Sequence, residues 1–226
     1  MKVCLAHSDV QQQLYRCLLH DLKIPYVIAP QAGKYTRQTG EALASSEPLC
    51  ESLLSLLGSL CEGYFLGADC AIVTSPCEAC DSQSAVQRLG ECLHRSGMPL
   101  RRIVPAQPNG NAKELFDFLK VERGVSLFLF YDARRRFLEC RALLSDYESL
   151  RKQAFFKAEY QSYVCEVQRK IEDAGSLLEL KILLGAFSKK LEKIARNVPT
   201  NSAAKPHYCS ENRQMETFFA KFKKSG

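Results

Sequence analysis

Residues 68–89, "ADCAIVTSPCEACDSQSAVQRL", contain the pattern that decides the fold. Residues 69–75 form a short apolar run that is typical of a buried strand. A Ser-Pro pair ends this run, and Cys77 and Cys80 follow three positions apart. The polar segment 82–97 then has apolar residues at helical spacing. We therefore predict a strand, a turn that contains two cysteines, and a helix.

The same alternation of strand and helix extends in both directions along the chain. Residues 2–6, 25–30 and 100–105 are apolar runs of strand length, whereas residues 8–22 and 46–67 have helical periodicity. Alternating strands and helices predict a parallel sheet with helices on both faces. We expect an α/β fold of the Rossmann or flavodoxin-like kind, with about four strands.

The second half of the chain has a different pattern. From residue 111 onward it is almost wholly helical, although residues 125–131, "VSLFLFY", fit either a strand or a helix. We expect an α/β cysteine-containing module at residues 1–110. Residues 111–226 are expected to form a mainly helical region packed on that module.

Charge is also divided unevenly. Residues 1–131 carry 12 Lys and Arg against 13 Asp and Glu, whereas residues 132–226 carry 19 against 12, a net charge of +7. The simplest interpretation is a solvated helix surface, and the alternative is a docking face for an acidic protein or a nucleic acid. Nucleic acid ranks low as a partner because no zinc finger, RNP-like aromatic motif or dense Lys/Arg run is present.

Length and composition indicate a globular protein of the cell interior. The 226 residues are 46% hydrophobic, which is enough to bury a core. No uninterrupted apolar run approaches the roughly 20 residues that cross a bilayer, so we expect no membrane segment. The opening "MKVCLAHSDV" predicts a first strand instead of a signal peptide. The expected compartment is the cytoplasm.

The chain contains eleven cysteines, an odd number that does not suit a secreted disulfide scaffold. Several stand where a small apolar residue is expected inside a predicted strand or helix. These are Cys4, Cys17, Cys61, Cys70 and Cys92. We interpret them as buried thiols, because free cysteine is among the most buried residue types.

The pair Cys77 and Cys80 allows several kinds of chemistry. A structural disulfide is disfavoured by the small loop and by a reducing compartment. A thioredoxin-like dithiol suits a C-x-x-C between a strand and a helix, but the aromatic residue and Gly-Pro of that motif are missing. Zinc normally uses four ligands, and the chain has no second such pair. An iron–sulfur cluster also takes thiolates and accepts widely separated ligands. The residues alone leave these alternatives open.

Two segments, taken in order and spacing, resemble a known module. They are "ALASSEPLCESLLSLLGSL" at residues 42–60 and "LGADCAIVTSPCEACDSQSAVQRLGECLHRSGMPLRRIVP" at residues 66–105. The match is to the N-terminal cysteine-containing module of the 2-hydroxyacyl-CoA dehydratase and CoA-enzyme activase-associated family. That family includes benzoyl-CoA reductase and double-cubane cluster proteins of anaerobes. The resemblance covers about residues 1–110.

The resemblance implies a ligand set and a role. Cys50, which enters a Leu-rich helix, and the turn residues Cys77 and Cys80 correspond to the family's cluster cysteines. They would bind an iron–sulfur cluster, [4Fe–4S] or double-cubane, as metal ligands. The chain would then be an accessory or electron-transfer component of an ATP-dependent reductase system. Glu78 and Asp81 lie close to the pair and would disfavour the reduced, more negative state of a cluster.

The implied partner is an ATP-hydrolysing activase or another redox protein, and a homodimer is compatible with the sequence. The chain itself has no G-x-x-x-x-G-K-[ST] phosphate loop, and whether it is an enzyme is left open. The alternatives from other classes are a metal-free or zinc-binding protein-interaction module and a thioredoxin-like dithiol protein.

Overall fold

The computed structural model divides into a first unit, Met1–Arg196, which is compact, and the remaining residues 197–226. The residues that it describes all belong to the first unit. They are residues 1–6, 10–30, 33–45, 47–74, 82–106, 112–122, 126–155 and 158–196. Residues 211–224, for which the sequence pattern "ENRQMETFFAKFKK" predicts a last short helix, lie outside these ranges.

A four-stranded parallel sheet lies at the centre of the described unit. Its strands are β1 (Val3–Ala6), β2 (Tyr26–Ile28), β3 (Cys70–Thr74) and β4 (Arg102–Ala106). They are ordered β2-β1-β3-β4. Val3 pairs with both Tyr26 and Cys70, and Cys70 pairs with Arg102. The prediction of a parallel α/β sheet of four strands is confirmed.

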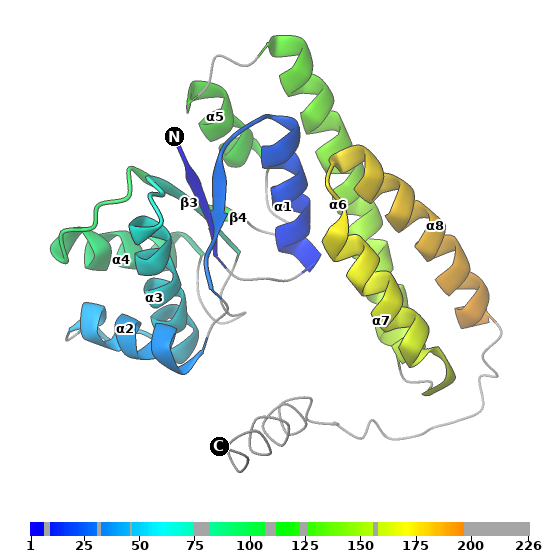
Figure 1. Ribbon diagram of the computed structural model, residues 1–226, viewed down its shortest axis with the longest axis horizontal. Helices are drawn as coiled ribbons and strands as arrows, with labels where there is room; N and C mark the ends of the chain where they lie inside the picture. Colours follow the sequence, from blue (N-terminus) through cyan, green and yellow to red (C-terminus); the bar gives the residue numbers. More distant parts are fainter. Residues whose placement is uncertain are drawn as a thin grey trace. The chain divides into compact units, whose positions relative to one another are not determined.

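Helices connect and cover the strands (Figure 1). They are α1 (Val10–Asp21), α2 (Lys34–Ala44), α3 (Glu51–Phe65), α4 (Ser82–Arg95), α5 (Lys113–Glu122), α6 (Leu127–Phe155), α7 (Ala158–Asp173) and α8 (Leu177–Arg196). The ambiguous segment at residues 125–131 is settled as helix where it is described, because α6 begins at Leu127. Helix α2 was not among the predicted elements, which leave residues 31–45 as a connection between a strand and a helix.

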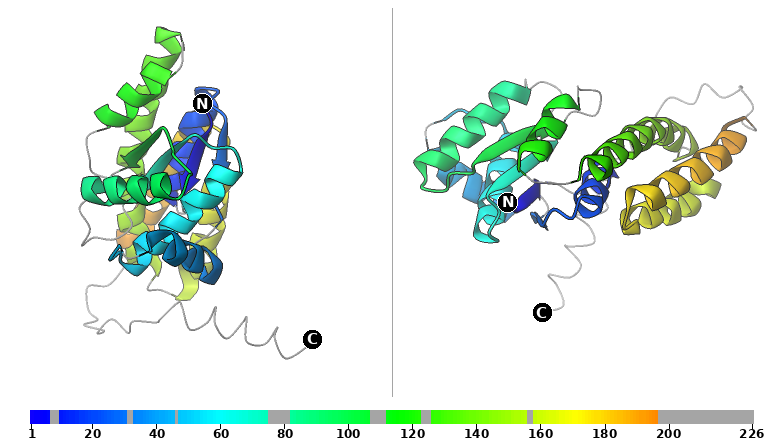
Figure 2. Two further views of the ribbon diagram at one scale, coloured as in Figure 1. Left: turned by 90° about the vertical axis from the view of Figure 1, so that its left-hand side faces the viewer. Right: turned by 90° about the horizontal axis from the view of Figure 1, so that it is seen from above.

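Side chains that alternate along each strand point to two separate cores. Val3 and Leu5 belong to a core that also contains residues of α1, α5, α6, α7 and α8. Cys4 and Ala6, one position out of phase, belong to a core formed with α2, α3 and α4. Helices therefore cover both faces of the sheet, as predicted (Figure 2). The boundary at residue 110 remains a prediction.

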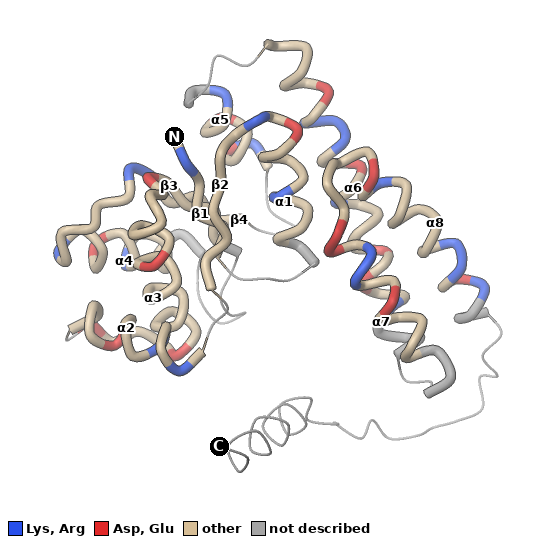
Figure 3. The backbone as a smooth tube through the Cα atoms, viewed as in Figure 1, with Lys and Arg blue, Asp and Glu red and all other residues tan. Residues whose placement is uncertain are grey.

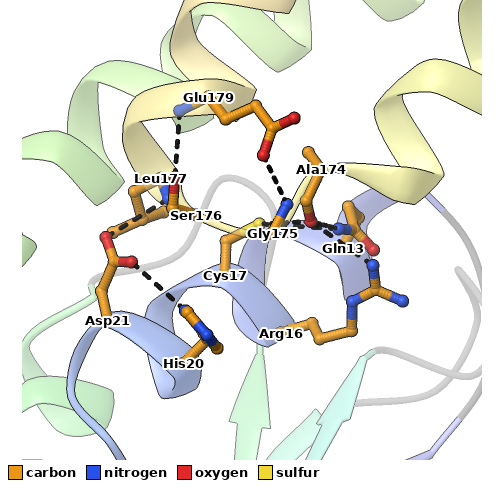
Figure 4. A network of polar contacts seen from close by, with 10 residues as sticks. All are labelled: Gln13, Arg16, Cys17, His20, Asp21, Ala174, Gly175, Ser176, Leu177 and Glu179. Atoms are coloured by element: carbon orange, nitrogen blue, oxygen red, sulfur yellow. Dashed lines mark hydrogen bonds and ion pairs between the residues drawn. The ribbon is translucent and has the colours of Figure 1, made fainter.

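The connection between α7 and α8 is held against α1 by polar contacts (Figure 4). The Ala174 carbonyl accepts hydrogen bonds from the side-chain amide of Gln13 and from the Cys17 thiol, the latter at 3.4 Å. The Leu177 backbone N–H donates to Asp21 Oδ2 over 3.3 Å, near the beginning of α8. Because α1 packs on the sheet, these contacts link the helices of the second half to the α/β layers.

None of the helices within the described ranges is both long enough and apolar enough to cross a membrane.

The cysteines predicted to be core residues are buried. Cys4, Cys17, Cys70 and Cys92 are fully inaccessible, and Cys61 is 5% exposed. All the described cysteines are thiols and not disulfides. Burial raises the pKa of Cys4 and of Cys17 to about 12. These residues therefore act as small apolar side chains, as expected.

We predict that alkaline pH weakens the fold through these thiols. Burial also raises the pKa of Cys140 to about 11, from 9.0 in its ordinary state. Because the folded state holds this thiol protonated, the buried Cys140 thiol contributes its full stabilisation below pH 9. That contribution to the free energy of unfolding is lost as the pH rises towards 11. Urea midpoints should fall over that interval. Cys140→Ala should reduce the slope, whereas Cys165→Ala, which alters an exposed thiol, should leave it unchanged. Equal slopes for the two variants would contradict this assignment.

Candidate functional site

The order of the strands places a switch point between β1 and β3. The chain passes from β1 to β2 on one side, and from β3 to β4 on the other. In open parallel sheets, ligands bind beyond the carboxyl ends of the strands at such a point. β3, one of the two strands at the switch point, ends at Thr74.

Helix α3 runs antiparallel to the strands and extends past this end of the sheet. Near its C-terminus, the Leu66 carbonyl accepts a hydrogen bond from Lys2 Nζ at 2.7 Å, beside the start of β1. Further back, the Ser59 hydroxyl donates to the carbonyl of Pro30, which follows β2, over 3.4 Å. Ser59 is thus level with the carboxyl ends of the strands. The first two turns of α3 project beyond them.

The projecting part of α3 is supported by α2. The two helices approach so closely that only glycine fits at two places in their contact. A Cβ on Gly58 would overlap the Thr36 carbonyl oxygen and lie 2.6 Å from its carbonyl carbon. A Cβ on Gly40 would meet the Leu54 backbone in the same way. The pair of helices therefore forms a firm support for the residue at the N-terminus of α3.

That residue is Cys50. It is the N-cap of α3, in extended conformation, and its carbonyl accepts the first helical hydrogen bond from Leu54 at 2.9 Å. Its side chain is exposed, which among the described cysteines is true only of Cys50 and Cys165. The N-terminus of a helix carries partial positive charge and favours an anionic group such as a thiolate or a cluster.

Three arginines surround the chain on either side of Cys50. Arg88 Nε lies 3.2 Å from Glu47 Oε1, and Arg88 also donates to the Pro48 carbonyl. Arg95 reaches the other oxygen of Glu47 at 3.6 Å. Arg37 pairs with Glu51 at 2.9 Å. Arg37 also pairs with Glu41 at 2.9 Å, so three arginines are matched by three carboxylates, and the partial positive charge of the α3 N-terminus is not opposed by a net negative charge.

Two of these arginines were not predicted to belong to the site. Arg88 and Arg95 occur in an ordinary amphipathic helix, forty residues from Cys50 in the chain, and no motif marks them. The signal that could have found them is their spacing. Two arginines seven residues apart lie on one face of α4, which faces the segment before Cys50.

The predicted ligands are placed only in part. Cys50 is described and accessible, whereas Cys77 and Cys80 lie outside the described residues. Within the described ranges, no group of three His, Cys, Asp or Glu side chains is arranged to hold a metal ion. A centre that uses Cys50 therefore needs donors from outside the described residues.

Comparison with known proteins gives no relative. No protein-family model, no curated protein and no solved structure matches the chain. The likeness to the dehydratase and activase-associated module therefore remains a proposal.

Proposed function

We propose that the protein binds an iron–sulfur cluster through Cys50, Cys77 and Cys80 and serves as an accessory or electron-transfer component of an activase-dependent reductase system. The observation that carries the proposal is the position of Cys50. It is an exposed thiol at a helix N-terminus, on the part of α3 that projects past the carboxyl ends of the strands.

The three proposed ligands are cysteine thiols, which suits an iron–sulfur cluster. Thiolates are the ordinary ligands of iron–sulfur clusters, which tolerate ligands from separate turns of a fold. The buried cysteines are poor competitors, because a thiol with a pKa of about 12, such as Cys4, does not readily form a thiolate. Accessible thiols at the end of the sheet are therefore the favoured ligands.

The charges around Cys50 favour an anionic group. Arg37, Arg88 and Arg95 offset the nearby carboxylates, and the α3 N-terminus adds partial positive charge. The helix N-terminus would oppose the effect of Glu78 and Asp81, which would disfavour a reduced cluster. The cluster, when bound, supplies a site that stores and releases one electron at a time. The residues of this chain hold it and set the charge around it.

The decisive measurement is anaerobic metal analysis combined with an absorption spectrum. Wild-type protein, reconstituted with iron and sulfide, is expected to be brown and to bind about four irons per chain. A Cys77→Ala, Cys80→Ala double variant should lose the iron and the colour. Cys50→Ala should lose most of both. Cys165→Ala is the matched control, because Cys165 is also exposed but lies on α7.

Other outcomes assign the alternatives. Zinc in place of iron, lost from the same variants, would indicate a zinc-binding module. Colourless protein that contains no metal and is unaffected by the cysteine substitutions would indicate a metal-free interaction module. A thioredoxin-like dithiol would show instead a redox-dependent disulfide between Cys77 and Cys80 that does not involve Cys50.

A further inference from the structure

The first turn of α6 carries large apolar side chains that are exposed. Leu127 is 60% exposed, Phe128 83% and Leu129 37%, and Tyr131, one turn after Leu127, is 55% exposed. Within the part of the chain that the structure describes, no other large apolar side chain is as exposed as Phe128. We call these four residues the α6 tip. A group of exposed apolar side chains of this kind marks an interaction site.

The α6 tip is apolar around most of the helix and not along one side alone. Successive residues of an α-helix are about 100° apart, so residues 127–129 cover roughly 200° of the circumference. Phe130 points inward: it is 5% exposed, and its ring packs edge-on against Phe116 of α5 at 5.7 Å. The beginning of α6 extends beyond α5 and the sheet (Figure 1, Figure 2). A protein docked on one side would leave part of the tip in water, whereas a lipid layer that surrounds the helix end would cover all of it.

Basic residues follow the tip at a short distance. Arg134, Arg135 and Arg136 come six to eight residues after Phe128, about 9–12 Å along the helix. Arg134 is exposed, and its guanidinium lies over the Phe116 ring at 5.7 Å from the centroid. Residues 113–136 carry six Lys and Arg against four Asp and Glu, a net charge of +2, and Figure 3 shows Lys and Arg on α5 and on the first half of α6. Cations at this height above an inserted tip are complementary to anionic lipid headgroups.

The carboxylates of α6 nearest the tip are compensated within the protein. Asp132 is shared by Arg135 and Arg136, at 2.8 and 2.7 Å. Glu139 pairs with Lys181 of α8 at 2.7 Å, and Arg135 approaches it at 3.9 Å. Neither carboxylate therefore presents an uncompensated negative charge to an anionic surface.

The helix end limits how deeply the tip enters lipid. The Phe130 N–H donates to the Ser126 carbonyl at 3.0 Å, which is the first helical hydrogen bond of α6. The N–H groups that precede it have no acceptor inside the helix, as at any helix N-terminus. Hydrocarbon offers them none, whereas the phosphates and water of the headgroup layer do. We therefore expect a shallow insertion, about 5–10 Å deep, with the tip's side chains below the headgroups and its backbone among them.

We propose that the α6 tip inserts into the surface of an anionic lipid bilayer. Leu127, Phe128 and Leu129 enter the boundary between headgroups and acyl chains, Tyr131 lies at the interface, and Arg134 contacts the lipid phosphates. This contact is peripheral, uses none of the cysteines and does not depend on the cluster.

Tryptophan fluorescence tests the insertion directly, because the chain contains no tryptophan of its own. Phe128→Trp protein, mixed with vesicles of phosphatidylcholine and phosphatidylserine, should show a blue-shifted emission that lipids brominated near the headgroup quench. Vesicles of phosphatidylcholine alone should produce a much smaller shift. Phe65→Trp is the matched control, because Phe65 is 75% exposed but lies at the end of α3, and its emission should not change.

Sedimentation with the same vesicles measures the affinity. Phe128→Ser should weaken binding about tenfold, because a large apolar side chain no longer leaves water, whereas Phe65→Ser should not weaken it. Arg134→Gln should weaken binding about fivefold, which is the effect of one basic residue near an anionic surface. Arg169→Gln, which alters an exposed arginine on α7, is the control for that change.

Four results would overturn the proposal. The first is a wild-type protein that binds neither kind of vesicle, and the second is equal binding to both kinds. The third is bound protein in which the tryptophan at the tip keeps its emission in water, because another surface would then contact the lipid. The fourth is an emission that shifts with protein concentration in the absence of lipid, which would assign the tip to a protein contact. The Cys77→Ala, Cys80→Ala variant should bind vesicles like the wild type, which separates this proposal from the cluster.

Discussion

Replacing Gly58 with alanine is expected to lower the free energy of unfolding by about 3 kcal/mol or more. The added methyl group would overlap the carbonyl oxygen of Thr36 and lie 2.6 Å from the carbonyl carbon and 2.9 Å from the Cα. All three are backbone atoms of α2, so no side-chain rotation can relieve the overlap. The two helices must separate, and the projecting part of α3 that bears Cys50 must move with them.

A matched control is present on another helix. Gly185 lies within α8, and a Cβ built there meets nothing within 4 Å. Gly185→Ala is expected to raise the free energy of unfolding by about 0.5–1 kcal/mol, because alanine loses less conformational entropy in a helix than glycine does. Urea denaturation of the two variants measures both changes. A Gly58→Ala protein as stable as the wild type would disprove the close approach of α2 and α3.

The alternation of strands and helices could be predicted because its signals are local. Each strand is a short apolar run, and the helices that follow them have large apolar residues at helical spacing. Helix α2 lacks that signal. Its buried residues are Thr36, Gly40 and Ala44, which are small or polar and read as a loop. They are buried because α3 lies so close, and that contact depends on another part of the chain.

The candidate site could likewise be predicted only where its signal is local in the sequence. Cys50 was singled out because a cysteine at the start of a Leu-rich helix forms part of a recognisable order of motifs. The neutralisation of Glu47 beside Cys50 was not predicted, because it comes from Arg88 and Arg95 on a helix that follows a different strand. Residue type and spacing can nominate a ligand, whereas the charge around it is set by tertiary packing.

The second large effect is expected from Phe137→Ala, which should lower the free energy of unfolding by about 3–5 kcal/mol. Phe137 is 1% exposed. Its ring packs between Tyr15 of α1, at a centroid distance of 5.5 Å, and Phe116 of α5, at 5.4 Å. Truncation therefore leaves a cavity where α6 meets two helices that share a core with Val3 and Leu5 of the sheet.

The shared core also predicts how the Phe137→Ala protein unfolds. Helical signal and aromatic signal should be lost in one transition, since the sheet and α6 contribute to the same core. Phe65→Ala, at a ring that is 75% exposed, is the control and should change stability by less than about 0.5 kcal/mol. Phe137→Leu, which keeps most of the volume, should cost less than Phe137→Ala and provides a folded variant if the alanine form does not accumulate. Two separate transitions, with the helical half melting first, would show that α6 is stabilised independently of the sheet.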